Sequence, residues 1–237
     1  MRLPCAKLDS VTYEVEGKRI IDDVTLSLCS GLNLLLGPNG AGKTTMLRLL
    51  AGIIRPTRGS VTIDGLRPSS LRNRLTYIPS QLTVDLLTRV VDLGEAMNFN
   101  KGDGWRRSLR AYLELLGVAW AEERRLETLS SGEQRLATLA AALSRETDVI
   151  LADEPTAFLD LGNQAKVFSL LRYLADKNRL VVVATHDVRF VDLADQVIVL
   201  KGGRVLYAGP PARIGEDLLS RAYGVRMKLA NGWQAQL

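Results

Sequence analysis

A glycine-rich segment over residues 37–44, Gly-Pro-Asn-Gly-Ala-Gly-Lys-Thr, limits the possible folds of this 237-residue chain more than any other feature. It matches the pattern G-x-x-x-x-G-K-[ST], in which glycines let successive backbone N–H groups turn toward phosphate oxygens. An apolar segment over residues 32–36 precedes it and a helical pattern over residues 43–50 follows, so the positive end of the helix faces the same place. By chance the pattern should occur in roughly one chain in a hundred of this length. We therefore predict a phosphate-binding loop between a strand and a helix.

The predicted binding loop and an acidic motif together indicate ATP and Mg²⁺. The loop consists of Gly37, Pro38, Asn39, Gly40, Ala41, Gly42, Lys43, Thr44 and Thr45. Lys43 is expected to reach the β- and γ-phosphates, and the Thr44 hydroxyl to bind Mg²⁺. The apolar run over residues 149–152 ends in two carboxylates. Asp153 is expected to bind Mg²⁺, and Glu154 to orient and deprotonate the attacking water.

Strand-like and helix-like segments alternate along most of the chain, which predicts a mostly parallel sheet covered by helices. The first 30 residues differ, because residues 7–14 and 19–28 read as two strands joined near Gly17. Further strands are predicted at residues 60–63, 75–78, 149–152, 180–184, 196–200 and 205–207. The predicted fold class is α/β: a P-loop NTPase core of the RecA-like type with an N-terminal antiparallel β subdomain.

The strand signal disappears between residues 81 and 129. Apolar residues recur there at helical spacing, over residues 86–99 and 109–116. We interpret residues 81–129 as an α-helical subdomain inserted into one domain that spans residues 1–237. Residues 1–80 and 130–237 would then form the core together with the β subdomain.

The composition excludes several classes of protein. Hydrophobic residues make up 46% of the chain, but no apolar run approaches the roughly 18 residues that a membrane-spanning helix requires, and the N-terminus lacks a signal peptide. We therefore expect a soluble, cytoplasmic protein. The net charge of +5 is dispersed, which argues against nucleic acid as a partner. Cys5 and Cys29 have neither metal-site nor CxxC spacing, so we expect two free thiols.

Residues 129–135, Leu-Ser-Ser-Gly-Glu-Gln-Arg, stand shortly before the acidic motif. They resemble the LSGGQ signature of the ABC ATPase family, and the resemblance covers nearly the whole chain. It implies that Tyr13 stacks on adenine and that His186, the single histidine, is the switch histidine at the end of a strand. It also implies that Asp160 belongs to the loop that links two active sites.

The same resemblance implies a homodimer with two composite ATP sites. The signature residues would bind the γ-phosphate of the ATP held by the other copy; they are Ser130, Ser131, Gly132 and Glu133. A helix that begins near Gly132 would present free N–H groups to that anion. Binding would then close the dimer, and hydrolysis would release it.

The sequence departs from the family pattern at two places. The signature has Ser131 where glycine is usual and Glu133 where glutamine is common. A serine would be disfavoured if this position needs a positive φ. The glutamine that senses Mg²⁺ and the membrane partner is the second departure, because Ser80 stands at its usual place and Gln81 follows. We assign that role, and a place at the metal, to Gln81.

The segment from Asn100 to Asp103 fits the N-K-x-D pattern that reads guanine in GTPases. In GTPases it follows a buried strand, whereas here it follows a helical pattern. We therefore predict ATP rather than GTP as the nucleotide.

The C-terminal segment refines the functional prediction. Residues 216–229 resemble a short helix with a Tyr-Gly end and a final strand in importers of iron–siderophore, haem and cobalamin. A generic amphipathic helix capped by Gly224 is the alternative interpretation. The resemblance to importers implies permease subunits and a substrate-binding protein as partners, at the inner face of the cell membrane. An ABC subunit for another substrate, export included, and a soluble ABC ATPase that acts on DNA or ribosomes remain open.

Overall fold

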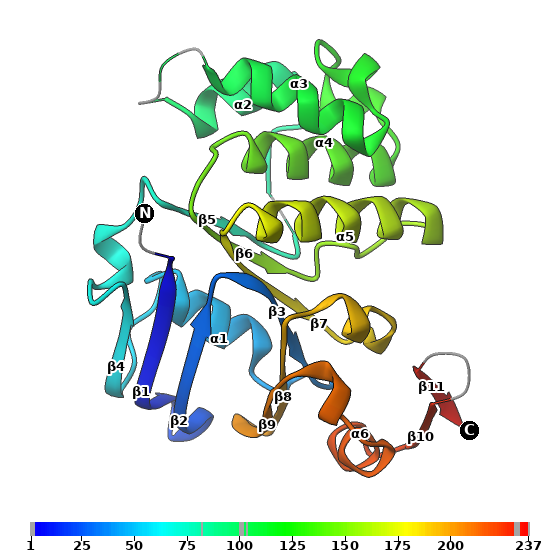
Figure 1. Cartoon of the computed structure of the whole chain (residues 1–237). Helices are drawn as coiled ribbons and strands as arrows, with labels where there is room; N and C mark the ends of the chain where they lie inside the picture. Colours follow the sequence, from blue (N-terminus) through cyan, green and yellow to red (C-terminus); the bar gives the residue numbers. More distant parts are fainter. Residues whose placement is uncertain (1–2, 82, 100–101, 103, 230–232, 237) are drawn as a thin grey trace.

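The computed structural model describes residues 3–81, 83–99, 102, 104–229 and 233–236. Its largest sheet has six strands in the order β5-β6-β7-β3-β8-β9 (Figure 1). These strands are β3 (Gly31–Leu36), β5 (Leu75–Ile78), β6 (Val149–Asp153), β7 (Leu180–Thr185), β8 (Gln196–Lys201) and β9 (Arg204–Gly209). Five of them run parallel, and β9 pairs antiparallel with β8. The prediction of a mostly parallel sheet is confirmed.

Helices cover both faces of this sheet, so its central strands are buried along their whole length. The helices are α1 (Lys43–Leu50), α2 (Val90–Met97), α3 (Gly104–Leu116), α4 (Ser131–Leu143), α5 (Leu161–Asp176) and α6 (Glu216–Tyr223). All six residues of β3 and of β7 are buried, as expected for parallel strands covered on both sides. Alternate side chains enter two separate cores. Leu34 packs in the core shared with α4 and α5, whereas Leu35 packs in the core shared with α1.

The N-terminal strands form a second, antiparallel sheet in the order β2-β1-β4. They are β1 (Cys5–Val15), β2 (Lys18–Cys29) and β4 (Arg58–Ile63). Gly17 lies in the turn between β1 and β2 with φ 77°, the conformation for which glycine was predicted there. α1 lies between the two sheets and shares one core with both (Figure 1). The second sheet therefore buries the helix that follows the binding loop.

The expectation of two free thiols is wrong. Cys5 and Cys29 form a disulfide, with an S–S distance of 2.02 Å. The two residues lie directly opposite each other in the register of β1 and β2. Sequence spacing does not reveal such a pair, because strand register is set by side-chain packing and turn geometry. The bridge closes the open end of this hairpin.

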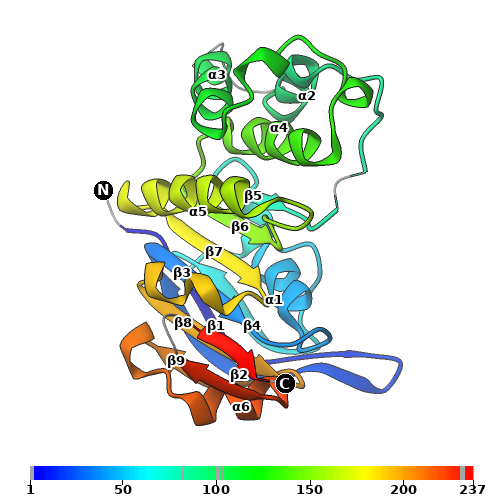
Figure 2. The ribbon, with the colours of Figure 1, turned by 90° about the vertical axis from the view of Figure 1, so that its right-hand side faces the viewer.

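Residues 81–129, interpreted above as a helical insertion, contain α2 and α3, and α4 packs against both of them. These three helices form a layer at one end of the molecule; α5 lies between this layer and much of the main sheet, while α4 also contacts β5 (Figures 1 and 2). The helix predicted over residues 86–99 is shorter than expected, because α2 begins at Val90. Before it, Leu86 and Thr88 accept backbone hydrogen bonds from residues 126–127, at 2.8 and 3.0 Å. These bonds hold residues 86–88 in a non-helical conformation. Asn100, Lys101 and Asp103, which define the N-K-x-D motif, lie outside the described part of the chain.

The chain ends in α6 and a hairpin of β10 (Arg226–Leu229) and β11 (Trp233–Gln236), at the bottom of Figure 2. The predicted helix, its glycine cap and the following strand are confirmed, because Gly224 ends α6 with φ 73°. Short 3-10 segments lie at Pro68–Ser70, Ala119–Ala121, Leu126–Thr128, Val188–Leu193 and Pro211–Arg213. Within the described residues, none of the helices combines the length and the apolar character that spanning a bilayer requires.

Candidate active site

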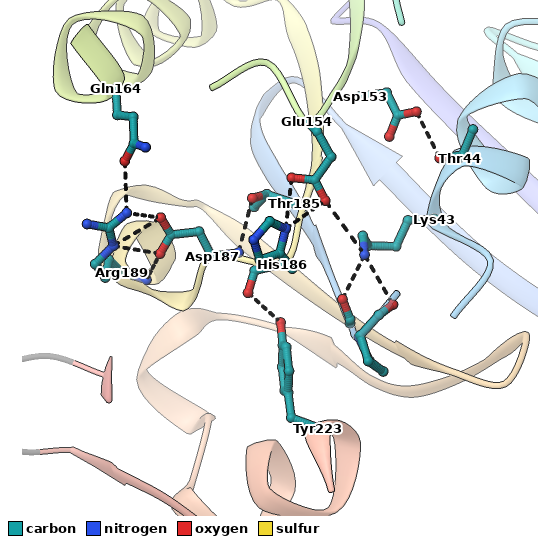
Figure 3. A network of polar contacts seen from close by, with 12 residues as sticks. Lys43, Thr44, Asp153, Glu154, Gln164, Thr185, His186, Asp187, Arg189 and Tyr223 are labelled. Carbon is teal, nitrogen blue, oxygen red and sulfur yellow. Dashed lines mark hydrogen bonds and ion pairs between the residues drawn. The ribbon is translucent and has the colours of Figure 1, made fainter. Parts of the chain in front are cut away.

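Three neighbouring parallel strands deliver the predicted catalytic residues to one edge of the main sheet. β3 pairs with β7, and β7 pairs with β6, so their carboxyl ends lie side by side. The binding loop follows β3, Glu154 follows β6 and His186 follows β7. Carboxyl ends of parallel strands are the usual place for ligand sites in such folds. Figure 3 shows the side chains of Lys43, Glu154 and His186 pointing toward one another.

The binding loop requires glycine at two positions for steric reasons. A Cβ on Gly37 would lie 2.3 Å from the carbonyl oxygen of Leu200, and the φ of Gly37 is 155°. A Cβ on Gly42 would lie 2.9 Å from the carbonyl oxygen of Ile20, at a φ of 104°. The N–H groups of the first turn of α1 have no acceptor within the helix and face the loop. This geometry is suited to an anion.

Lys43 is nearly buried beneath the loop. Its side chain is 7% exposed, and Nζ donates to the carbonyl oxygens of Gly37 at 2.7 Å and Pro38 at 3.2 Å. Nζ also lies 3.8 Å from a carboxylate oxygen of Glu154. Burial lowers the pKa of Lys43, while the charges of Glu154 and Asp153 raise it. A cation is thus held at the base of the loop by two carbonyls and two carboxylates.

Thr44, in the first turn of α1, lies next to Asp153, the last residue of β6. The Thr44 hydroxyl donates to Asp153 Oδ2 at 2.8 Å. Burial raises the pKa of Asp153, and the hydrogen bond from Thr44 opposes this shift. Asp153 is 1% exposed, and its Oδ1 has no hydrogen-bond partner among the described residues.

A buried carboxylate oxygen without a partner fits a hard cation, which prefers oxygen ligands. No group of three or more His, Cys, Asp and Glu residues in the described part of the chain could hold a metal. Mg²⁺ does not need such a group, because it is commonly bound by one or two protein oxygens together with substrate phosphates and water. Thr44 and Asp153 therefore fit the ion that the sequence predicts.

Glu154 is held in a backbone conformation that side chains rarely adopt. Its φ is 44°, and its N–H donates to the carbonyl oxygen of Ala184 at 2.8 Å. Both carboxylate oxygens lie 3.1 Å from Nδ1 of His186 (Figure 3). Such outliers persist only where surrounding contacts enforce them, and they cluster at functional sites.

Arg135 of α4 supplies part of that support, although the sequence analysis gave it no role. Its guanidinium is buried and donates to the carbonyls of Pro79 at 2.9 Å, Glu154 at 3.0 Å, Pro155 at 3.2 Å and Asp153 at 3.4 Å. Arg135 ends the signature segment, so its place in the motif was the available signal. Its contacts with the backbone after β6 depend on packing between α4 and the sheet.

The loop after His186 is fixed by its own polar groups. The Asp187 N–H donates to the Thr185 hydroxyl at 3.1 Å. The Arg189 guanidinium pairs with the Asp187 carboxylate and donates to Gln164 at 2.8 Å (Figure 3). Burial raises the pKa of Asp187, but its bonds with Arg189 prevail and lower it. A charged, hydrogen-bonded turn therefore supports the histidine.

A cavity of about 620 Å³ surrounds the binding loop. It is lined by Lys18, Arg19, Ile20, Asn39, Gly40, Ala41, Gly42, Lys43, Thr44, Thr45, Glu154 and Gly202. Tyr13 is not among these residues; it lies in β1, half-buried, and packs against the core around α1. Its stacking on adenine remains a prediction. Lys18 and Arg19, for which the sequence predicts no role, line the cavity from the start of β2.

The signature residues are placed elsewhere, at the start of α4. The Ser130 hydroxyl accepts from the N–H of Glu133, and the Glu133 carboxylate accepts from the N–H of Ser130 at 2.8 Å, which makes a capping box. Ser131 is the first residue of α4 and is not among the residues with positive φ. Serine is therefore not disfavoured there on backbone grounds. None of these residues, nor Gly132, lines the cavity around the binding loop.

Two further predicted residues also lie outside that cavity. Asp160 caps α5, where its carboxylate accepts from the N–H of Asn163 at 2.8 Å. Gln81 is exposed after β5, and among the described residues no hydrogen bond joins it to Thr44 or Asp153. Its role at the metal remains a prediction.

Comparison with known proteins identifies the family. The profile of the ABC transporter family matches residues 21–157, more than half of the chain. The chain belongs to the ABC transporter family. Within it, this chain is an ATP-binding, ATP-hydrolysing subunit, as the sequence predicts.

The similarity to individual ABC relatives extends over most of this chain but over very different shares of the relatives. An ATP-binding/permease protein of Mycobacterium tuberculosis is 36% identical over 86% of this chain, which spans 25% of that relative. A hemin import ATP-binding protein of Agrobacterium fabrum is 32% identical, over 92% of this chain and 91% of the relative. Among solved structures, a chain of an ABC transporter assigned to the metal-chelate type has the same fold. It gives a TM-score of 0.81 at 23% identity, over 98% of this chain and 96% of that one.

Proposed function

We propose that this ABC subunit binds Mg-ATP in the loop after β3 and hydrolyses it to drive import of a metal chelate across a membrane. The observation that carries the catalytic part is the convergence of three polar side chains at one sheet edge. Glu154 lies 3.1 Å from Nδ1 of His186 and 3.8 Å from Nζ of Lys43, and it follows the buried Asp153 in the chain.

Each residue has a chemical task in this proposal. Lys43 and the N–H groups of the binding loop bind the β- and γ-phosphates. Thr44 and Asp153 would hold Mg²⁺, with Gln81 as a further ligand, and the ion would neutralise phosphate charge. A water attacks the γ-phosphorus and gives a proton to Glu154, while the bond to the β-phosphate oxygen breaks. His186 holds the Glu154 carboxylate in position for that proton transfer.

The signature residues act on the ATP of a second copy. Their placement at the start of α4, outside the cavity of their own binding loop, supports this assignment. The N–H groups of Ser131 and Gly132 lie at the positive end of a 13-residue helix, where the helix itself offers them no acceptor. Two copies would therefore form two composite ATP sites, with the loop that ends at Asp160 between them. ATP binding closes this homodimer and hydrolysis opens it.

The proposal of metal-chelate import rests on the C-terminal segment and on the relatives. The helix that ends at Tyr223 and Gly224, followed by β10, matches the expected importer pattern. The Agrobacterium relative, which bears the name of a hemin import protein, extends over nearly the same length. The expected partners are integral-membrane permease subunits and a substrate-binding protein. The subunit would lie in the cytoplasm against the inner face of the membrane.

The catalytic assignment is tested with Lys43→Ala, measured by phosphate release. We expect turnover to fall to background, because the phosphate charge loses its nearest cation. Lys177→Ala is the matched control, since this exposed lysine lies on the surface beside Tyr173. Hydrolysis at the wild-type rate by the Lys43 variant would disprove the assignment of the loop.

The transport assignment is tested by purifying the tagged subunit from its native membranes in mild detergent and identifying the proteins that accompany it. A polytopic permease together with a substrate-binding protein would support import, and haem, cobalamin and ferric-siderophore uptake can then be assayed in vesicles. Recovery with ribosomal or DNA-bound proteins instead would refute transport and leave the ATPase chemistry standing.

A further inference from the structure

Tyr223, the last residue of α6, contacts the main chain of the catalytic histidine. Its hydroxyl donates to the carbonyl oxygen of His186 at 3.1 Å, across 37 positions of sequence (Figure 3). The tyrosine ring is half-buried and packs against the larger core. Burial raises the pKa of Tyr223; a hydrogen bond with the Gly37 backbone opposes this shift, and the charges of Glu154 and Asp187 add to it. The phenol therefore stays protonated and remains a hydrogen-bond donor at neutral pH.

Buried side chains and hydrogen bonds hold α6, and with it the Tyr223 hydroxyl, in place. Leu219 and Ala222 are buried on its inner face. The Lys201 ammonium at the end of β8 donates to the carbonyl of Arg221, and the N–H of Met227 in β10 donates to the Ser220 hydroxyl at 2.9 Å. Side chains that position a catalytic group must themselves be held by packing and hydrogen bonds.

The Tyr223 hydroxyl binds the main chain of His186, whose imidazole lies 3.1 Å from the Glu154 carboxylate. A second hydrogen bond also holds the main chain of this turn: the N–H of Asp187 donates to the Thr185 hydroxyl at 3.1 Å. The His186 carbonyl belongs to the same peptide unit as that N–H, and Tyr223 holds its carbonyl edge from a separate element of the fold. Two anchors restrict rotation about the backbone of His186, and hence the direction in which its ring leaves the chain.

We propose that Tyr223 is a positioning residue for ATP hydrolysis: its hydroxyl holds the main chain of His186 and thereby keeps Nδ1 against the Glu154 carboxylate. This inference rests on the proposed function, in which His186 and Glu154 act together. It also ties the C-terminal segment to the rate of the chemical step. A partner that displaces α6 would slow hydrolysis without touching the nucleotide.

The test compares two tyrosine-to-phenylalanine changes. Tyr223→Phe keeps the ring and removes only the donor. Tyr207→Phe is the matched control, because the Tyr207 hydroxyl also donates to a main-chain carbonyl, that of Pro210 at 2.7 Å, away from the binding loop. We expect Tyr223→Phe to lower kcat about three- to tenfold, the typical worth of one hydrogen bond, with KM for ATP changed less than about twofold. Tyr207→Phe should change neither.

The single histidine of the chain allows a direct spectroscopic readout. In the full-length protein without a histidine tag, the imidazole ring protons give NMR signals that belong to His186 alone. Tyr223→Phe should shift these signals, whereas Tyr207→Phe should leave them at the wild-type position. A tyrosine that only fills space would leave them unchanged in both variants, and this result, or an unchanged kcat in Tyr223→Phe, would overturn the inference.

His186→Ala separates this inference from the proposed function. If His186→Ala hydrolyses ATP at the wild-type rate, the catalytic role of His186 fails, and the positioning role of Tyr223 fails with it. If His186→Ala loses activity while Tyr223→Phe does not, only the role of Tyr223 is refuted.

Discussion

Replacing Arg135 with methionine should lower the free energy of unfolding by about 3 kcal/mol and slow ATP hydrolysis more than tenfold. Two of its four hydrogen bonds, to the carbonyls of Pro79 and Glu154, are 3.0 Å or shorter. Hydrogen bonds that involve a charged group are worth about 1.5–3 kcal/mol each, so this pair contributes roughly 3–6 kcal/mol. Methionine fills similar space and removes the cost of burying a guanidinium, which offsets part of the loss.

The expected loss of activity follows from the backbone of Glu154. Its φ of 44° is unfavourable for a side chain and persists because neighbouring contacts hold it. Without Arg135 the carbonyl of Glu154 loses the shorter of two hydrogen bonds and keeps the one from the N–H of Ala157, at 3.1 Å. The main chain can then relax, which moves the carboxylate away from His186 and from the position of the attacking water.

Urea unfolding followed by tryptophan fluorescence measures the change in stability. With a denaturant dependence of about 3 kcal/mol per molar, a loss of 3 kcal/mol moves the midpoint down by about 1 M. Arg110→Met is the matched control, since that side chain is 62% exposed and pairs with Glu122 on the surface, so its loss should cost less than about 1 kcal/mol. A midpoint for Arg135→Met equal to that of the wild type, with normal phosphate release, would refute the reasoning.

Three further outcomes are expected. Glu154→Gln should bind ATP but not hydrolyse it, and light scattering should detect a stable ATP-bound dimer; normal turnover would show that Glu154 is not the base. Tyr13→Ala should raise KM for ATP more than it lowers kcat, because stacking is mostly uniform binding, and steady-state kinetics showing a pure kcat effect would contradict adenine stacking. Cys5→Ser combined with Cys29→Ser should lower the free energy of unfolding by about 3 kcal/mol, given the closed loop between residues 24 positions apart. Thiol titration of unreduced, denatured wild type should detect no free thiol, and two free thiols would exclude the bridge.

The sequence alone was enough to predict those features that depend on the residues of one short segment. The binding loop follows from the spacing of Gly37 and Gly42 around Lys43, because backbone conformation is decided by the residues themselves. The end of α6 followed from Gly224 in the same way, since a left-handed cap favours glycine. The strands of the main sheet could be predicted because strands buried on both faces are continuously apolar.

The tertiary structure decided everything that depends on contact between distant segments. The register of β1 against β2 brings Cys5 opposite Cys29, and no spacing rule predicts that. Backbone bonds from residues 126–127 keep residues 86–88 out of the helix that their apolar pattern favours. The sequence supplied Glu154 from the apolar run that precedes it, which is a local feature, and His186 through the resemblance to ABC ATPases. Their separation of 3.1 Å, and the support from Arg135 and Tyr223, required folding, because it brings α4, β6, β7 and α6 to one edge of the sheet.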